Sequence, residues 1–273
     1  MQDILLKRIK QLPPLPESAL QIEAVYQNPD SSFKDMVAIL EKDPLLTADI
    51  LKAANSPLYG FSREIKAISQ AVSLFGMGAI RGFALASVVK KSFALDLSPY
   101  NMTEKHFSEL SKQQHALVVA WYKKSNPQLL GLLSPAAFLV GIGKVLIAQS
   151  LLSESKVENF KSLLTEKSVT EAENETYNTT TARVSATIFD QWKFDKNLIE
   201  VIKNCDNVQD TTIEDTNVLL SAQSLHVTRT LFSSKIIITD ENIEAAKALI
   251  TQYKLDMPSF ELALETIKNS TSS

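Results

Sequence analysis

The chain has only one cysteine, three histidines and seven glycines among its 273 residues. The single cysteine, Cys205, excludes an internal disulfide and a cysteine-based zinc site, and it fits the reducing environment of the cytoplasm. The small number of glycines, with no alternating pattern of strands and helices, argues against an α/β fold. These shortages favour an all-α fold in which helices are joined by short connections.

The chain also lacks a strong net charge and an unbroken apolar segment. Its formal net charge is −3, which gives no overall attraction to nucleic acid or to an anionic membrane. The N-terminal sequence MQDILLKRIKQLPPLP has charge and proline after a short apolar stretch, so it is not a signal peptide. The longest apolar stretch, residues 129–152, is interrupted by Pro135, Gly141, Gly143 and Lys144 and is not expected to span a membrane. We therefore expect a soluble, cytoplasmic protein with neither a membrane nor a nucleic-acid partner.

Apolar spacing predicts helices along most of the chain. In residues 33–40, apolar side chains recur at i, i+3, i+4 and i+7, which places them on one face of a helix. Ser32 precedes this helix as a cap, and Asp35 stands in the capping-box position. Asp43 and Pro44 predict the start of the next helix, because a carboxylate caps it and a proline at its first position loses no hydrogen bond.

Three further signals concern the ends of two predicted helices and one possible strand. The second helix should stop near Asn55 and Ser56, because the following proline disfavours helix in the residue before it. The next helix begins at about Arg63 and should end at Gly76. Only "SKIIITD" (residues 234–240) has the composition of a strand, and one isolated strand cannot form a sheet.

The stretch "AAFLVGIGKVLIAQ" (residues 136–149) contains two glycines and a lysine in an apolar run, as a phosphate-binding loop would. A Walker A loop needs a glycine five residues before its Gly-Lys pair and a serine or threonine after the pair. Phe138 and Val145 stand at those positions around Gly143 and Lys144. We therefore reject a phosphate-binding loop.

Other candidate sites are weak on the residues alone. His106, His115 and His226 are scattered without the paired spacing of a helical metal site, so a structural role is favoured for His115. Cys205 has no signature of an activated nucleophile, and we interpret it as an ordinary helix cysteine. Residues 74–91 have the helix–glycine–helix spacing of a DNA-binding motif, but the second helix is too apolar to present a polar face to DNA.

Three segments in the N-terminal third carry a family pattern. They are "LPPLPESALQI" (12–22), "ILEKDPLLTADILKAANSPLYG" (39–60) and "EIKAISQAVSLFGMGAIRGFAL" (64–85), with Phe75 in place of a usual leucine before Gly76. In order and spacing they resemble the HDOD family, the HD-related output domain of bacterial signalling proteins. The resemblance implies signal transduction in a bacterium. The positions that match family motifs are Asp43, Pro44, Asn55, Ser56, Gly76, Gly143, Lys144 and Trp192.

HDOD domains resemble the metal-dependent HD phosphohydrolases, in which histidine and aspartate ligands hold divalent metals. The resemblance places His115 at the first ligand position. The other ligand positions carry residues that cannot take over this role: Val140 and Gly141 for the His-Asp pair, Thr181 for a histidine, and Asn204 and Cys205 for a His-His pair. One remaining histidine cannot hold a catalytic metal, so the resemblance implies a pseudoenzyme with no metal and no cofactor.

We expect a single HDOD-like domain over residues 1–273, in which an N-terminal helical part (1–102) packs against a degenerate HD-like part (103–273). The match covers nearly the whole chain, so we expect no attached receiver or cyclase domain. The expected function is non-catalytic regulation through contacts with signalling proteins that the sequence does not identify. For Asn55 and Ser56 we favour a role in ending the helix and fixing the turn over a direct functional role.

Two other functions stay open. One is a metal-dependent phosphohydrolase with an atypical ligand set drawn from Glu175, Asp190 and Asp195. The other is a receptor that uses the former metal cleft to bind a nucleotide without hydrolysing it. Metal retention with chelator-sensitive turnover would identify the first, and stabilisation by a nucleotide would identify the second.

Overall fold

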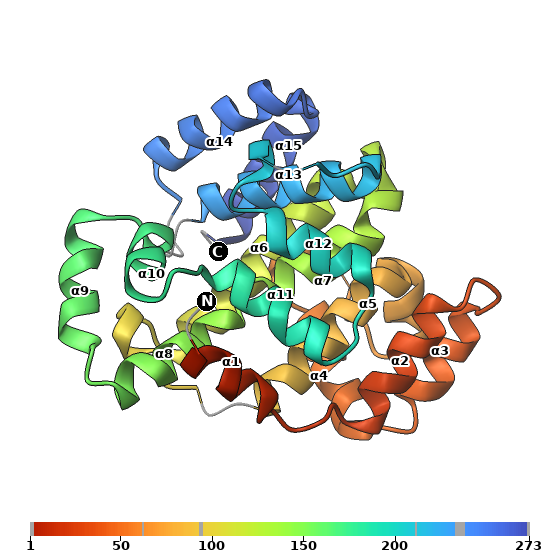
Figure 1. Ribbon diagram of the computed structural model, residues 1–273. Coiled ribbons are helices and arrows are strands. Elements are labelled where there is room, and N and C mark those ends of the chain that lie inside the picture. Colours follow the sequence, from red (N-terminus) through yellow and green to blue (C-terminus); the bar gives the residue numbers. More distant parts are fainter. Residues whose placement is uncertain (1–2, 62, 93–94, 211, 233–237, 272–273) are drawn as a thin grey trace.

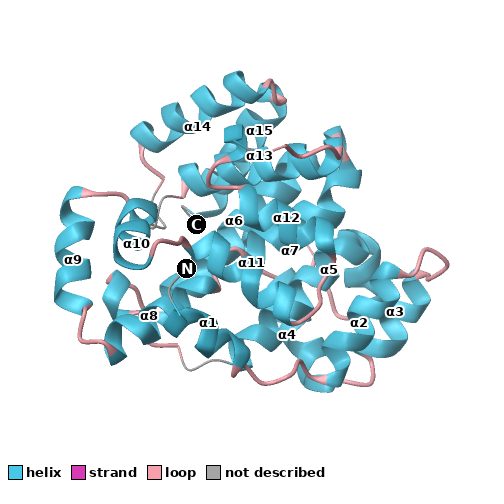
Figure 2. Ribbon diagram, in the orientation of Figure 1, coloured by secondary structure: helices cyan, strands magenta, loops and turns pink. Residues whose placement is uncertain are grey.

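The computed structural model describes residues 3–61, 63–92, 95–210, 212–232 and 238–271. Within these ranges helices are the only regular elements, as Figure 2 shows, and this confirms the all-α prediction. Of the predicted strand at 234–240, residues 234–237 lie outside the described ranges. Ile238 and Thr239 are in no strand, and Asp240 begins a helix instead.

The helices follow one another with short connections, and Figure 1 shows α2 to α5 grouped on one side of the molecule and α9 with α10 on the other. The N-terminal elements are α1 (Asp3–Lys10), α2 (Glu17–Gln27), α3 (Phe33–Leu40), α4 (Pro44–Ala54), η1 (Pro57–Tyr59), α5 (Ile68–Ser92) and η2 (Ser98–Tyr100). They are followed by α6 (Glu104–Ser125), η3 (Pro127–Leu129), α7 (Leu130–Leu139), α8 (Gly143–Ser153), α9 (Val157–Glu166) and α10 (Val169–Tyr177). The last elements are α11 (Thr181–Gln191), α12 (Lys196–Asn204), η4 (Val208–Asp210), α13 (Thr216–Leu231), α14 (Asp240–Tyr253) and α15 (Met257–Thr271).

The predicted helix caps are present. The Asp35 carboxylate accepts a hydrogen bond from the Ser32 backbone N–H at 2.8 Å, which completes the capping box of α3. At the start of α4, Asp43 accepts from the Leu46 N–H at 3.0 Å, and Pro44 takes the first helical position. These caps satisfy N–H groups that a helix start leaves without intrahelical partners.

Gly76 breaks α5 where the sequence predicted an end. Its φ of 79° and ψ of 165° are not helical, so α5 consists of two helices joined at a kink. Only glycine adopts a positive φ of this kind without strain. The second of these helices packs against α7, and the two backbones touch: a Cβ on Gly78 would lie 2.8 Å from the Cα of Gly131.

The helix α7 is at the centre of the protein, since it contacts α5, α6, α12 and α13. Nearly all of its residues are buried and it is apolar on every side, as expected of a helix surrounded by others. By length and composition, two described segments could span a membrane, 68–88 and 127–153, and the second includes α7. In the second segment, 78% of the most apolar stretch of 18 residues is buried inside the protein. Packing in the core therefore accounts for the apolar composition of this segment.

The N-terminal and C-terminal parts share one hydrophobic core that extends from Leu5 to Ile267. The indole N–H of Trp192, at the end of α11, donates to the backbone oxygen of Pro13 at 3.1 Å. Trp192, a family-motif position, thus attaches the C-terminal part to the proline-rich segment near the N-terminus. Helix α15 makes a second connection of this kind, because it packs against both η1 and α6.

Asn55 holds the end of α4 to the loop that follows. Its side-chain oxygen accepts from the Ile65 N–H at 2.8 Å, and its amide group donates to the oxygens of Ile65 and Leu51, each at 2.9 Å. These bonds fit the architectural role expected of this motif position.

We predict that Asn55→Ala lowers the free energy of unfolding by about 2 kcal/mol, because three hydrogen bonds to backbone groups are lost. Urea denaturation followed by circular dichroism measures this change. Asn55→Asp is the matched control: it keeps an acceptor for the Ile65 N–H but loses both donations, and it should fall between the wild type and Asn55→Ala. A loss below about 0.5 kcal/mol for Asn55→Ala would contradict this role.

Candidate functional site

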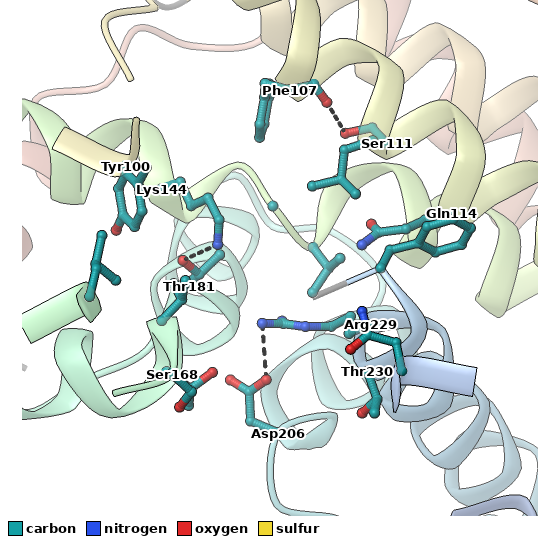
Figure 3. Close-up of a pocket in the computed structure, with 18 of the residues that line it drawn as sticks. Tyr100, Phe107, Ser111, Gln114, Lys144, Ser168, Thr181, Asp206, Arg229 and Thr230 are labelled. Carbon is teal, nitrogen blue, oxygen red and sulfur yellow. Dashed lines mark hydrogen bonds and ion pairs between the residues drawn. The ribbon is translucent and has the colours of Figure 1, made fainter. Parts of the chain in front are cut away.

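A cavity of about 850 Å³ lies between α6, α8, α10, α11 and α13, and it is large enough for a small ligand. Three positions that the sequence matched to metal ligands line it: Val140, Gly141 and Thr181. Figure 3 shows Thr181 on the cavity wall beside Lys144. Asn204 and Cys205 do not line the cavity, but their neighbour Asp206 does. The structure therefore brings three of the six positions that the sequence matched to metal ligands to one cavity.

Ser185 fixes the turn that carries Val140 and Gly141. Its hydroxyl group donates to the Val140 oxygen at 2.7 Å and accepts from the Gly143 N–H at 2.8 Å. A Cβ on Gly143 would lie 2.3 Å from the Thr181 oxygen, so the first turn of α8 touches the backbone of α11. The sequence singled out Gly143 but gave no indication of Ser185.

The ring of Phe107 stands over Gly141. A Cβ built on Gly141 would lie 3.0 Å from Cε2 of Phe107, which is too close for an ordinary contact. Phe107 also lines the cavity. An aromatic ring therefore occupies the space into which an acidic ligand at position 141 would project.

Lys144, on the cavity wall, forms a buried ion pair with Glu173, which lies behind it. The Lys144 ammonium lies 3.9 Å from Oε1 of Glu173, 3.3 Å from the Thr181 hydroxyl and 5.2 Å from the centre of the Tyr100 ring. Glu173 also accepts from the Tyr100 hydroxyl at 2.9 Å and from the Thr181 N–H at 2.5 Å. Burial lowers the pKa of Lys144, and the carboxylate of Glu173 opposes that shift. The cation at this site is an ammonium group that belongs to the protein.

A second ion pair joins Arg229 of α13 to Asp206, with 3.1 Å between Nη2 and Oδ1. Burial alone would lower the pKa of Arg229, but Asp206 and Cys205 more than offset it, and the pKa is raised. His226, one turn earlier, lines the same cavity, and its Nδ1 lies 2.8 Å from the Tyr253 hydroxyl. Burial lowers the pKa of His226, which disfavours the charged form of its imidazole, while Asp206 acts in the opposite direction.

His115, the expected first ligand, is not brought to the cavity. It is fully buried, with Nδ1 2.6 Å from the Tyr59 hydroxyl and Nε2 2.6 Å from the Ser134 hydroxyl. Its ring stacks on Phe138 at 4.0 Å between centroids, and burial holds its pKa well below the ordinary value. The residue of α6 that does line the cavity is its neighbour Gln114. His115 has the structural role that the residues alone favoured.

The alternative ligand set is not assembled either. Asp195 caps α12 by accepting from the Leu198 N–H at 2.9 Å, and Glu175 pairs with Lys167 on the surface. Asp190 is exposed on α11. Over the described part of the chain, no group of three or more histidine, cysteine, aspartate or glutamate side chains is arranged to hold a metal.

Arg81, a basic residue in the rejected DNA-binding motif, is fully buried. Its guanidinium group donates to both oxygens of Glu23, at 2.5 and 2.8 Å, and lies 4.3 Å from the centre of the Tyr26 ring. It cannot reach a DNA groove. The side chains of the other two basic residues of that motif, Lys90 and Lys91, lie outside the part that the structure describes.

The comparisons with known proteins agree with this architecture. The family model of the HDOD domain matches residues 12–208. An uncharacterized protein of Treponema pallidum (strain Nichols) is 35% identical over 74 residues, which are 27% of this chain and only 14% of that protein's length. A virulence factor from Campylobacter jejuni subsp. jejuni, known from its crystal structure, is 28% identical with a TM-score of 0.59, over 99% of this chain and 100% of that one. A Shewanella amazonensis SB2B protein that carries the provisional name phosphohydrolase is 21% identical, with a TM-score of 0.67. The match covers 97% of this chain and 94% of that one, and at this identity it shows the fold alone.

The helices and the cavity between α6, α8 and α11 define an all-α protein with a large cleft among its described residues. Since the family model covers most of the chain, the protein belongs to the HDOD family, which is related to the HD phosphohydrolases. This confirms the resemblance that the N-terminal motifs carried.

We predict that Gly143→Ala lowers the free energy of unfolding by about 3 kcal/mol or more, because its Cβ would meet backbone atoms of α11 that cannot move alone. Gly141→Ala is the matched control. Its Cβ meets the edge of the Phe107 ring, which can turn aside, so its cost should stay near 1 kcal/mol. Chemical denaturation of both variants checks the difference, and equal losses would contradict the close contact of α8 with α11.

We predict that Cys205 resists thiol reagents in the native protein. It is fully buried, and this burial raises its pKa to about 12, although Arg229 acts in the opposite direction. Labelling with a chromogenic disulfide at pH 8 should be at least ~100-fold slower in buffer than in denaturant. Labelling at the same rate in both conditions would show that the thiol is accessible.

Proposed function

We propose that this protein is a non-catalytic signal-transduction protein that acts through contacts with partner proteins. The observation that carries the proposal is the chemistry of the cavity wall at the former metal-ligand positions. Val140 and Gly141 offer no metal ligand at all, and Thr181 offers only a hydroxyl group that already donates to Glu173 and accepts from Lys144. A catalytic divalent metal needs about three protein ligands, so these residues do not fit one.

The electrostatics of the cavity support the same proposal. The Lys144 ammonium lies next to the buried carboxylate of Glu173. A divalent cation that approached this carboxylate would be repelled by the ammonium group. Asp206 is paired with Arg229 in the same way. Glu173 and Asp206 therefore each already have a cation of the protein beside them.

The proposed role in signalling rests on membership of the HDOD family, because the resemblance of the N-terminal motifs implies an output domain of signalling proteins. The provisional name of the Shewanella amazonensis protein gives the competing function, a phosphohydrolase. In this chain such an enzyme would need metal ligands outside the cleft wall described above.

The test combines metal analysis with turnover on one purified sample. We expect no stoichiometric bound metal and no chelator-sensitive hydrolysis of nucleotides, cyclic dinucleotides or a chromogenic phosphodiester. The double variant Val140→His, Gly141→Asp is the matched control, and it should not gain metal, because it supplies only two ligands while His115 stays bonded to Tyr59 and Ser134 away from the cavity. Bound metal together with turnover that a chelator abolishes would overturn the proposal. Affinity capture from the native host then identifies the partner protein.

A further inference from the structure

A pocket of about 460 Å³ lies between α4 and α5 on one side and α6 and the end of α7 on the other, and we call it the α4–α6 pocket. Its inner surface consists of four buried apolar residues: Phe83, Phe138, Leu139 and Ile142. Among the described residues that line it, none is a position that the sequence matched to a metal ligand. The α4–α6 pocket is therefore distinct from the cavity described above, although Phe107 and Ser111 line both.

The rings at the inner surface of this pocket are held by aromatic neighbours. The ring centroids of Phe83 and Phe138 lie 5.0 Å apart. Phe83 also packs edge to face against Phe75 at 5.3 Å, and Phe138 stacks on His115 at 4.0 Å. Protein interiors leave few voids larger than a water molecule, and close packing behind these rings opposes their collapse into the pocket. A preformed apolar pocket of this size is the feature expected of a ligand site.

The size and the walls of the α4–α6 pocket limit what it can hold. An apolar cavity of about 150 Å³ is enough to bind benzene, and this pocket is roughly three times as large. Three phenylalanines, Phe83, Phe107 and Phe138, belong to its lining. Aromatic side chains make favourable edge-to-face and offset contacts with another ring. The pocket therefore favours a ligand of about two rings.

The charged residues of the lining carry equal numbers of positive and negative charges. Among the described residues that line the pocket, two are acidic and two are basic: Asp49, Glu104, Lys52 and Lys112. Each of α4 and α6 contributes one residue of each sign. The lining thus gives no net attraction for a charged ligand, and the apolar inner surface opposes burial of a charge without a partner. Both features favour an uncharged ligand.

Three serines, Ser87, Ser108 and Ser111, are the uncharged polar residues of the lining. The Ser87 hydroxyl donates to Oδ2 of Asp49 at 2.6 Å. The Ser111 hydroxyl donates to the backbone oxygen of Phe107 at 3.1 Å, as Figure 3 shows. These bonds use the hydroxyl hydrogens, so the two oxygens keep lone pairs that can accept a hydrogen bond. A ligand with one N–H or O–H donor matches these acceptors.

We propose that the α4–α6 pocket is a binding site for a small, uncharged aromatic molecule of about two rings with a single hydrogen-bond donor, which is the chemistry of indole. The rings pack among the phenylalanines, and the donor bonds to a serine oxygen of the lining. This inference goes beyond the proposed function, because it concerns a different pocket and a ligand that is bound without reaction.

The test is isothermal titration calorimetry of the full chain with indole. We expect one site per chain, a Kd of about 1 mM or tighter, and a negative heat-capacity change from the burial of apolar surface. The matched ligand control is benzofuran, which has the shape of indole with an oxygen in place of the N–H group. It should bind about fivefold more weakly, which is the effect of one lost hydrogen bond.

The variant Ala53→Phe places a ring in the pocket, because Ala53 is half-buried on α4 and belongs to the lining. It should weaken the binding of indole at least ~10-fold, since the new side chain takes the space of the ligand. Ala48→Phe is the matched control on the same helix: Ala48 is exposed and is not among the lining residues, so its variant should keep the affinity of the wild type. If circular dichroism shows that Ala53→Phe does not fold, Ala86→Leu fills the pocket from α5 with a smaller side chain.

Three results would overturn the inference: a Kd for indole weaker than about 1 mM, an unchanged affinity in the folded pocket-filling variant, or equal affinities for indole and benzofuran. Indole binds no catalytic metal and has no phosphoester bond. Failure of this test would therefore leave the proposed function untouched, and metal-dependent turnover would leave the indole site untouched.

Discussion

The close contact between the first turn of α8 and the backbone of α11 is the constraint on which the site depends. Gly143 allows this contact, because any Cβ there would meet the Thr181 oxygen. Ser185 holds the contact by hydrogen bonds to both ends of the turn before α8. As a result Thr181 reaches the Lys144 ammonium, and Gly141 is placed on the cavity wall. Gly143 and Ser185 therefore shape this part of the cavity, although neither of them lines it.

The buried ion pair explains how a cleft without metal ligands remains stable. A lone charge at this depth would be costly, and each charge here is compensated. Glu173 accepts from the Tyr100 hydroxyl and from the N–H and hydroxyl of Thr181, and it faces the Lys144 ammonium. The acidic group that a metal site would need is thus fully used inside the protein. This pairing is consistent with the proposed absence of a metal, since the Lys144 ammonium repels any cation that enters.

The sequence predicted the features that depend on neighbouring residues. The capping box of Ser32 and Asp35, the Asp43 cap and the break at Gly76 are local, because each is decided by residues within one turn of a helix. The side of α6 that faces the cavity was not predictable in this way. Successive residues on a helix point about 100° apart, so the difference between His115 and Gln114 depends on how the whole helix packs.

Other parts of the site depend on contacts between distant segments. Arg229 and Asp206 lie on different elements, and only their packing shows that they form a pair. The sequence carried only a weak signal for this pair. Arg229 lies in a largely apolar helix, 216–231, where a charged side chain is unexpected unless it is paired. Ser185 gave no signal, because a serine in a helix usually faces solvent or the preceding turn.

Several of the family-motif segments that this chain retains hold the core together away from the cavity. Tyr59, from the segment after Asn55, reaches His115, and His115 reaches Ser134 on α7, so a chain of hydrogen bonds crosses from the N-terminal part to the central helix. Trp192 ties α11 to the loop at Pro13. These contacts are needed for folding whether or not a metal is bound. A chain can therefore keep these contacts, and with them a recognisable HDOD sequence, whatever the chemistry of its cleft.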